Sequence, residues 1–188
     1  MLSGAGGSAL LELYYKPRRE RWRASALLLS EVLLNTDLAL AEAAARFDNA
    51  KKLPADFSFS LMAWDVVAPR LSELPPELLK RVLHLYNRYR TCNHAVELHA
   101  KAVDERTSLP KENDERRKQI TVFLNSTIDV FYTALDAALE DARDILPNLL
   151  ELGGGRRRPR AAVETVRLRI EQYFAERDRR RHTLERSA

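Results

Sequence analysis

Apolar residues recur every three or four positions through three long stretches of this chain, and this spacing restricts the fold more than any other feature. It places apolar side chains on one face of an α-helix. The most regular stripe lies in residues 76–106 and comprises Leu79, Val82, Tyr86, Tyr89, Asn93, Val96, Ala100 and Val103. It is the pattern of a coiled-coil seam made for another helix. We therefore predict an all-α protein.

The same spacing continues in two other long segments, and breaks in it set the element boundaries. Long helices are predicted near 18–47, 76–106 and 111–151, with a short helix near 60–68 and a basic helix near 160–181. Pro147 is expected to bend or end the third long helix. The predicted fold is an antiparallel helical bundle of three to four long helices with one short connecting helix.

The chain divides into three parts by composition. Residues 1–17 form an apolar and basic stub, residues 18–152 form the bundle domain, and residues 153–188 form a glycine hinge followed by the basic helix. The hinge, Gly153 to Gly155, leaves three placements open for the last helix. It can pack on the bundle, exchange with another subunit or swing free.

Two asparagines interrupt the apolar stripes. Asn35 lies between two stripes of residues 18–47, and Asn93 lies inside the seam. A lone amide in such a seam fixes register. We predict that Asn35 and Asn93 bond each other across two antiparallel helices, and that Cys92 is a buried small hydrophobe.

Aromatic residues gather in the segment between the first two long helices. Phe57, Phe59 and Trp64 alternate there with polar residues, and Ser58 or Ser60 is suited to open a short helix. We interpret the aromatics as a plug at one end of the bundle. A cradle for a small ligand is the alternative interpretation.

Positive charge concentrates at both ends of the chain. The total is +4, but residues 1–23 carry +3 and residues 156–188 carry +6, which leaves −5 for the middle. The first basic run follows Leu13, Tyr14 and Tyr15, and an apolar, aromatic and then cationic order is typical of a chain leaving a bilayer toward the cytoplasm. The residues predicted to contact a membrane or another anion are Lys16, Arg18, Arg19, Arg21, Arg23, Arg156, Arg157, Arg158 and Arg160.

The apolar stub is short for a membrane span. A spanning helix needs about 20 apolar residues, and Gly4, Gly6 and Gly7 occur among the residues before Lys16. The stub is the tail of a longer membrane helix, an interfacial anchor or an ordinary helix start. It is not a secretory signal, because its positive charge follows the apolar run.

Catalytic patterns are missing from the sequence. His94 and His99 are five residues apart and lie on different faces of a helix, so they do not form a metal pair. Cys92 is the only cysteine, which excludes an intrachain disulfide and a thiolate zinc site. We predict no enzyme activity, no cofactor, no metal and no small-molecule substrate.

The chain resembles a loose group of uncharacterised bacterial membrane-associated proteins, in which a transmembrane helix is followed by a basic junction and a helical domain. The likeness covers about residues 10–100 and comprises 13–20, 26–35, 53–57, 74–79, Tyr86 and Asn93. The resemblance implies a polar core made of Glu31, Asn35, Tyr86 and Asn93. It implies no activity.

These observations predict a non-enzymatic interaction domain that binds a protein partner, or a second copy of itself, through helix faces. We expect a cytoplasmic protein attached to the anionic inner face of the plasma membrane. The alternative is a soluble oligomeric helical protein that binds nucleic acid without sequence specificity through its arginine-rich C-terminal segment. Glu164 and Glu176 interrupt that segment, which counts against a continuous basic stripe for nucleic acid, and the same arginines suit anionic lipid headgroups equally well.

Overall fold

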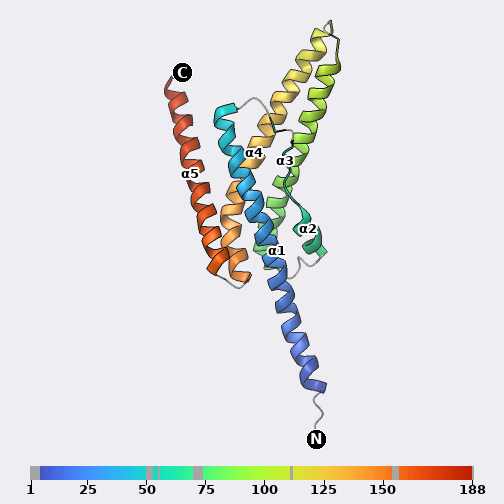
Figure 1. The fold of residues 1–188 in the computed structure, drawn as a ribbon, viewed down its shortest axis with the longest axis vertical. Coiled ribbons are helices and arrows are strands. Elements are labelled where there is room, and N and C mark those ends of the chain that lie inside the picture. The colour runs from blue at the N-terminus through green and yellow to red at the C-terminus, as the bar shows by residue number, and fades with distance from the viewer. Residues whose placement is uncertain are drawn as a thin grey trace.

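The computed structural model describes residues 5–49, 53–54, 56–69, 74–110, 112–153 and 157–187, with the side chains of 5–18, 48, 49, 157, 158, 184 and 187 not described. The described part contains five helices and no strand (Figure 1). They are α1 (Ala5–Asn49), α2 (Met62–Val67), α3 (Pro76–Ser108), α4 (Asp114–Leu152) and α5 (Arg157–Ser187). The predicted all-α bundle is confirmed.

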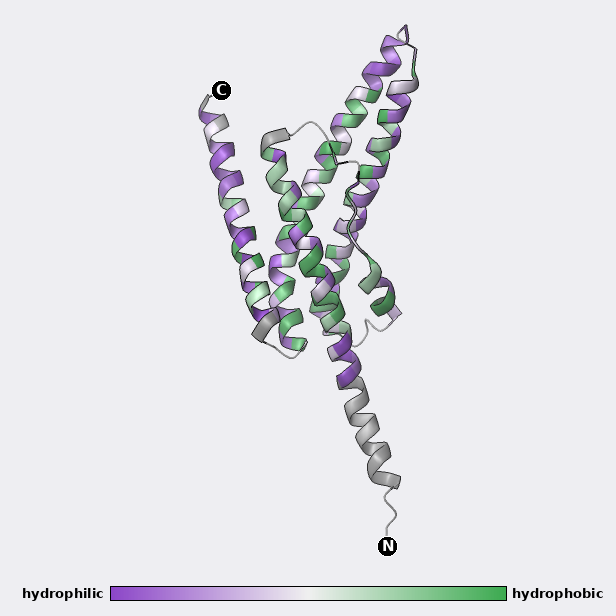
Figure 2. Ribbon diagram, viewed as in Figure 1, coloured by the Kyte–Doolittle hydropathy of each residue, from purple (hydrophilic) through white to green (hydrophobic). Residues whose placement is uncertain are grey.

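The centre of the bundle is α4, which packs against α1, α3 and α5. It runs opposite to these three helices (Figure 1). Its core face follows the predicted spacing and comprises Ile128, Phe131, Leu135, Ala138, Leu139, Ala142, Ile145, Leu146 and Leu149. Hydrophobic residues accordingly concentrate where α1, α3 and α4 face one another, whereas α5 is mainly hydrophilic (Figure 2).

The helix α1 is longer than predicted. It begins at Ala5, passes Pro17 and continues to Asn49, so residues 5–17 belong to the same helix as the bundle segment. Its first buried side chain in the described range is that of Ala24. About 28 Å of helix therefore precede the bundle, at 1.5 Å per residue, and this part projects beyond the other helices (Figure 1).

Only part of the apolar surface of α1 packs in the core. Leu28, Val32 and Ala39 are buried, whereas Leu27 is 48% exposed and Leu34 is 64% exposed. The uncovered stripe comprises Leu27, Leu34, Leu38, Ala41 and Ala45. On the neighbouring α2, Met62 and Val66 are exposed as well. We call these seven residues the apolar stripe.

Of the two outcomes expected at Pro147, a bend or an end, the helix end does not occur there, because α4 continues to Leu152, close to the predicted limit at 151. Proline removes one backbone hydrogen bond near the helix end. The side chains of Ile145, Leu146, Leu149 and Leu150 around it are buried. Their burial holds this last part of α4 in place.

The last helix packs on the bundle of its own chain. Val163, Val166, Ile170 and Tyr173 of α5 are buried in the same core cluster as residues of α1 and α4. Of the three placements left open by the glycine hinge, the structure therefore shows the first.

Candidate functional site

A buried carboxylate organises the polar centre of the bundle. Glu31 on α1 is only 7% exposed. Its Oε1 accepts hydrogen bonds from the Tyr86 hydroxyl at 2.6 Å and the Trp64 backbone nitrogen at 3.4 Å. Its Oε2 accepts from the Ser60 hydroxyl at 2.8 Å and the Ala63 backbone nitrogen at 2.7 Å. A carboxylate has about four acceptor positions, so these contacts saturate Glu31.

Two of these bonds cap α2 from outside its own segment. The backbone N–H groups of Ala63 and Trp64 lie in the first turn of α2, where they lack intrahelical partners. The negative charge of Glu31 also complements the helix dipole there. Ser60, one of the residues predicted to open this helix, instead joins α2 to α1 by donating to Glu31.

Asn35 and Asn93 hold the extended segment just before α2. Asn35 accepts from the Ser60 backbone nitrogen at 3.0 Å and donates to its carbonyl oxygen at 2.8 Å. Asn93 does the same with Phe59, at 2.8 Å and 3.1 Å. Successive residues of an extended chain turn their backbone groups to opposite sides, so one amide binds from α1 and the other from α3.

This arrangement corrects the predicted bond between Asn35 and Asn93. The two residues belong to α1 and α3, which run parallel (Figure 1), and the segment around Phe59 and Ser60 separates them. We call Glu31, Asn35, Ser60, Tyr86 and Asn93 the polar clamp. The structure brings together all four polar residues that the sequence singled out and adds Ser60.

Aromatic rings fill the space around the polar clamp. Phe59 lies 4.4 Å from the Tyr89 ring, and Trp64 lies 4.6 Å from the Tyr86 ring, measured between centroids. Phe57 contacts Phe131 of α4 edge-on. These rings are buried in the groove between helices and do not plug an end of the bundle. Their contacts are those of a packed core.

The chemistry of this region is structural. Burial and the nearby Glu31 charge raise the pKa of Tyr86, which keeps its hydroxyl protonated as a donor. Burial raises the pKa of the Cys92 thiol to about 12, so Cys92 is not a thiolate nucleophile near neutral pH. Among the described residues, no three His, Cys, Asp or Glu side chains are grouped as metal ligands.

A second feature lies at the end of the bundle from which α1 projects. Gly153, just after α4, lies against α1: a methyl group on it would sit 3.9 Å from the Ala26 nitrogen and 3.0 Å from the Leu149 carbonyl oxygen. Ala26 follows Arg23 by three residues, and Gly153 precedes Arg156 by three. The segment of α1 that carries Arg19, Arg21 and Arg23 and the start of α5, which includes Arg160, therefore lie at the same end of the bundle, where α4 ends (Figure 1). We call this the basic end.

The described cations of the basic end face solvent. Arg19, Arg21 and Arg23 on α1 and Arg160 on α5 are exposed. Arg156 and the side chains of Lys16, Arg18, Arg157 and Arg158 lie outside the described residues.

Several other described arginines of α5 pair with acids. Arg169 pairs with Asp37 of α1, and Arg177 pairs with Asp136 of α4 at 3.3 Å. Arg179 and Arg180 pair with Glu176 of α5 itself. These arginines point to several sides of the helix and do not make one continuous basic face.

One helix, Arg19–Phe47 within α1, is long and apolar enough to cross a membrane. More than half of its most apolar window is buried inside the bundle, as in a core helix. Comparison of the chain with protein-family models, with curated proteins and with solved structures gave no match. The fold and the two features define an all-α bundle with a buried polar clamp and a basic end.

Proposed function

We propose that this protein is a non-enzymatic helical interaction domain attached to the cytoplasmic face of a membrane through its basic end. The observation that carries the proposal is the closeness of Gly153 to Ala26, which places the end of α4 beside the point where α1, with its exposed Arg19, Arg21 and Arg23, leaves the bundle. The projecting part of α1 carries the apolar, aromatic and basic residues in the order found at bilayer interfaces. The direction in which α1 projects and the charges of the basic end therefore support the same orientation, with the basic end facing the membrane.

The charges supply enough energy for such an attachment. Each Lys or Arg near an anionic leaflet contributes about 1 kcal/mol, and the attraction falls off within a Debye length of about 10 Å. The helix α3 has 33 residues and is about 50 Å long at 1.5 Å per residue, so the far end of the α3–α4 hairpin lies outside this range when the basic end faces the surface. Apolar burial of Leu10, Leu11 and Leu13 adds to the attraction.

Sedimentation of the full chain with vesicles tests this attachment. Reversing three exposed charges of the basic end, Arg19→Glu, Arg21→Glu and Arg23→Glu, is expected to weaken binding to phosphatidylserine-containing vesicles about 100-fold or more. The matched control reverses the exposed Lys101, Arg106 and Lys118 at the far hairpin and is expected to leave binding nearly unchanged. Equal weakening by both triple variants, or no binding by the wild-type chain, would contradict the proposal.

The apolar stripe is the face on which we place the protein contact. Its α1 residues from Leu27 to Ala45 follow the three and four spacing that suits a second helix, and they are uncharged. Copies bound to one membrane through α1 present this stripe in the same orientation. We propose that the occupant is the same stripe of a second copy, because an uncharged stripe meets its own copy without repulsion.

Analytical ultracentrifugation tests this contact. Leu34→Glu places a charge in the apolar stripe and is expected to weaken self-association by tenfold or more, about 1.4 kcal/mol. Leu168→Glu, at an exposed leucine of α5 outside the stripe, is the control and is expected to behave as the wild type. A wild-type chain that stays monomeric, or equal effects of both variants, would refute self-association through the stripe.

A further inference from the structure

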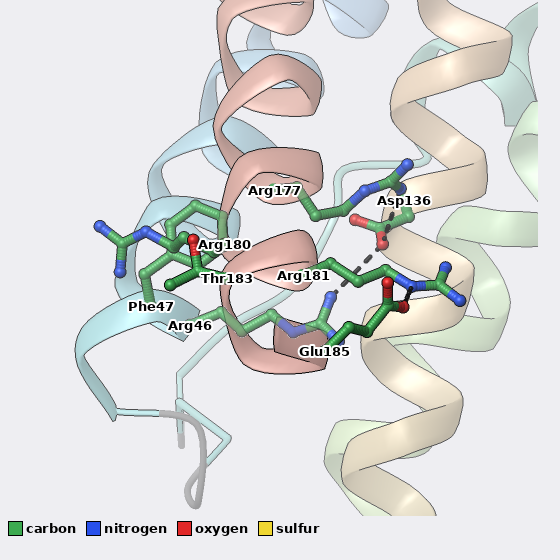
Figure 3. A pocket seen from close by; sticks show the side chains of 8 residues that line it. All are labelled: Arg46, Phe47, Asp136, Arg177, Arg180, Arg181, Thr183 and Glu185. Atoms are coloured by element: carbon green, nitrogen blue, oxygen red, sulfur yellow. Dashed lines mark hydrogen bonds and ion pairs between the residues drawn. The ribbon is translucent and has the colours of Figure 1, made fainter. Parts of the chain in front are cut away.

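A cavity of about 830 Å³ lies between the C-terminal part of α1, the middle of α4 and the C-terminal half of α5. It is separate from the polar clamp and from the basic end. Arginines from two helices line it, namely Arg46 of α1 and Arg177, Arg180 and Arg181 of α5. In Figure 3 the side chains of Arg46, Arg177 and Arg181 extend into the same space beside Asp136, whereas Arg180 points to the other side of α5 over Phe47.

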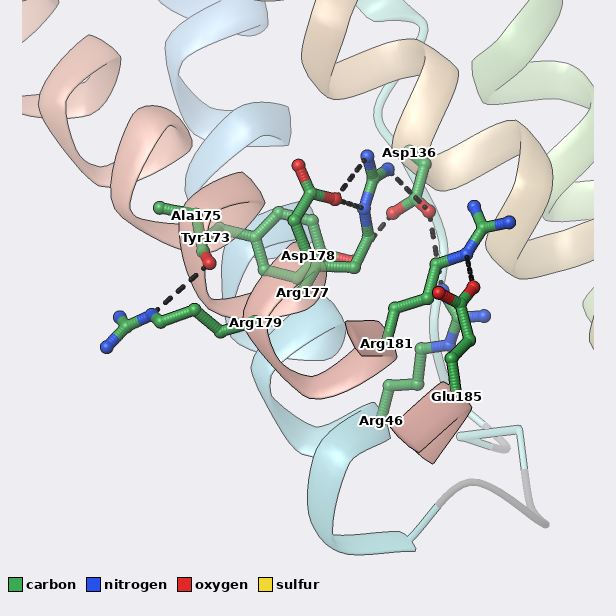
Figure 4. A network of polar contacts seen from close by, with 9 residues as sticks. All are labelled: Arg46, Asp136, Tyr173, Ala175, Arg177, Asp178, Arg179, Arg181 and Glu185. Carbon is green, nitrogen blue, oxygen red and sulfur yellow. Dashed lines mark hydrogen bonds and ion pairs between the residues drawn. The ribbon is translucent and has the colours of Figure 1, made fainter. Parts of the chain in front are cut away.

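Asp136 holds two of the guanidinium groups in place. Its side chain is 18% exposed and accepts from Arg46 and Arg177, both at 3.3 Å. The Tyr173 hydroxyl donates to it at 2.6 Å (Figure 4). The Arg46 guanidinium also lies over the Tyr132 ring, 4.8 Å from its centroid. The guanidinium groups of Arg46 and Arg177, which come from different helices, are therefore held in position before an anion binds. This lowers the entropic cost of binding the anion.

The remaining acids at the cavity are more exposed. Asp178 pairs with Arg177, and Glu185 pairs with Arg181, and the side chains of both acids are more than half exposed. Exposed ion pairs contribute only about 0–1 kcal/mol, so a stronger anion displaces them at little cost. The residues that line the cavity include four arginines and two acids, Asp136 and Glu185, so the lining carries a net charge of +2. That charge matches a phosphate dianion.

We propose that this cavity binds a small phosphorylated anion, a phosphate monoester or a pyrophosphate, between Arg46, Arg177 and Arg181. Guanidinium groups bind phosphate oxygens through paired, charge-assisted hydrogen bonds. The ligand bridges α1 and α5 and draws the C-terminal half of α5 toward the bundle. Arg46 lies 20 residues beyond Ala26, about 30 Å along α1, and so is far from a membrane that contacts the basic end. We therefore expect a soluble molecule, and not a lipid headgroup, to supply the phosphate.

Calorimetric titration of the full chain with inorganic pyrophosphate tests the site, with sodium chloride of equal ionic strength as the blank. The wild-type chain is expected to bind one pyrophosphate. Arg181→Gln is expected to weaken binding at least tenfold, because Arg181 has only an exposed ion pair with Glu185 and is not needed for folding. Arg179→Gln on the same helix is the matched control, and it is expected to stay within twofold of the wild type.

A second variant separates a built site from general attraction to α5. Arg46→Gln, on α1, is also expected to weaken pyrophosphate binding at least tenfold, with circular dichroism verifying the fold. Unchanged binding in this variant, equal weakening by Arg179→Gln, or no heat beyond the chloride blank would overturn the proposal. Vesicles containing phosphatidic acid form the other arm: their binding is expected to be unaffected by Arg181→Gln, and a loss there would assign the site to lipid headgroups.

Discussion

Replacing Glu31 with alanine is expected to lower the free energy of unfolding by about 3 kcal/mol or more. The change removes the acceptor of four hydrogen bonds and leaves the Tyr86 hydroxyl and the first N–H groups of α2 buried without their partner. Each buried donor left unpaired costs about 1–3 kcal/mol. For a chain of this size the loss corresponds to about 6–12 °C in the thermal midpoint, which differential scanning calorimetry measures.

The exposed Glu140 of α4 provides the control, since Glu140→Ala is expected to change stability by about 0.5 kcal/mol or less. A double-mutant cycle with Tyr86→Phe isolates the shortest bond of the polar clamp, and a coupling of about 1–2 kcal/mol is expected. A Glu31→Ala variant as stable as Glu140→Ala would show that the polar clamp does not hold α2 and the extended segment.

Phe131→Ala is expected to cost about 3–5 kcal/mol, because it removes a fully buried ring and opens a cavity in the core. The Phe131 ring is fully buried and lies 5.1 Å from both the Phe57 and the Tyr132 ring centroids. It joins α4 to the segment that the polar clamp holds. Urea unfolding followed by circular dichroism gives the change in stability.

The same helix offers a control of the same residue type. Phe123 is 44% exposed near the far end of the hairpin, and Phe123→Ala is expected to cost about 1 kcal/mol or less. Equal losses in the two variants would contradict the placement of the core along α4.

The helices and their core faces could be predicted because the spacing of apolar residues along a helix indicates directly which of its faces is buried. The face of α4 from Ile128 to Leu149 follows from its spacing alone. Spacing does not say how many sides of a helix find neighbours, so it could not show that Leu27, Leu34 and Leu38 of α1 stay exposed. The start of α1 was predicted near residue 18 because proline is typical of the first turn of a helix. The helix nevertheless continues through Pro17, since one missing backbone hydrogen bond did not break it.

The members of the polar clamp were also foreseeable, but their partners were not. Asn35 and Asn93 stand out as amides among apolar residues, and helix spacing suggests only other helices as partners. The backbone of Phe59 and Ser60 has no periodic signal, so its insertion between α1 and α3 depends on tertiary structure. Asp136 and Tyr173 were missed. An acid directly after Leu135 on a core-packed helix, with a tyrosine at a core position of α5, is the signal that marks them.

Hydrogen exchange of the full chain, measured with and without phosphatidylserine vesicles, tests the proposed orientation most directly. Added protection is expected in residues 10–27 and 151–162, the segments that contain Ala26 and Gly153, which lie close together. The far hairpin, residues 100–118, is expected to exchange as before. Protection of that hairpin, or an unchanged pattern at the basic end, would contradict the account.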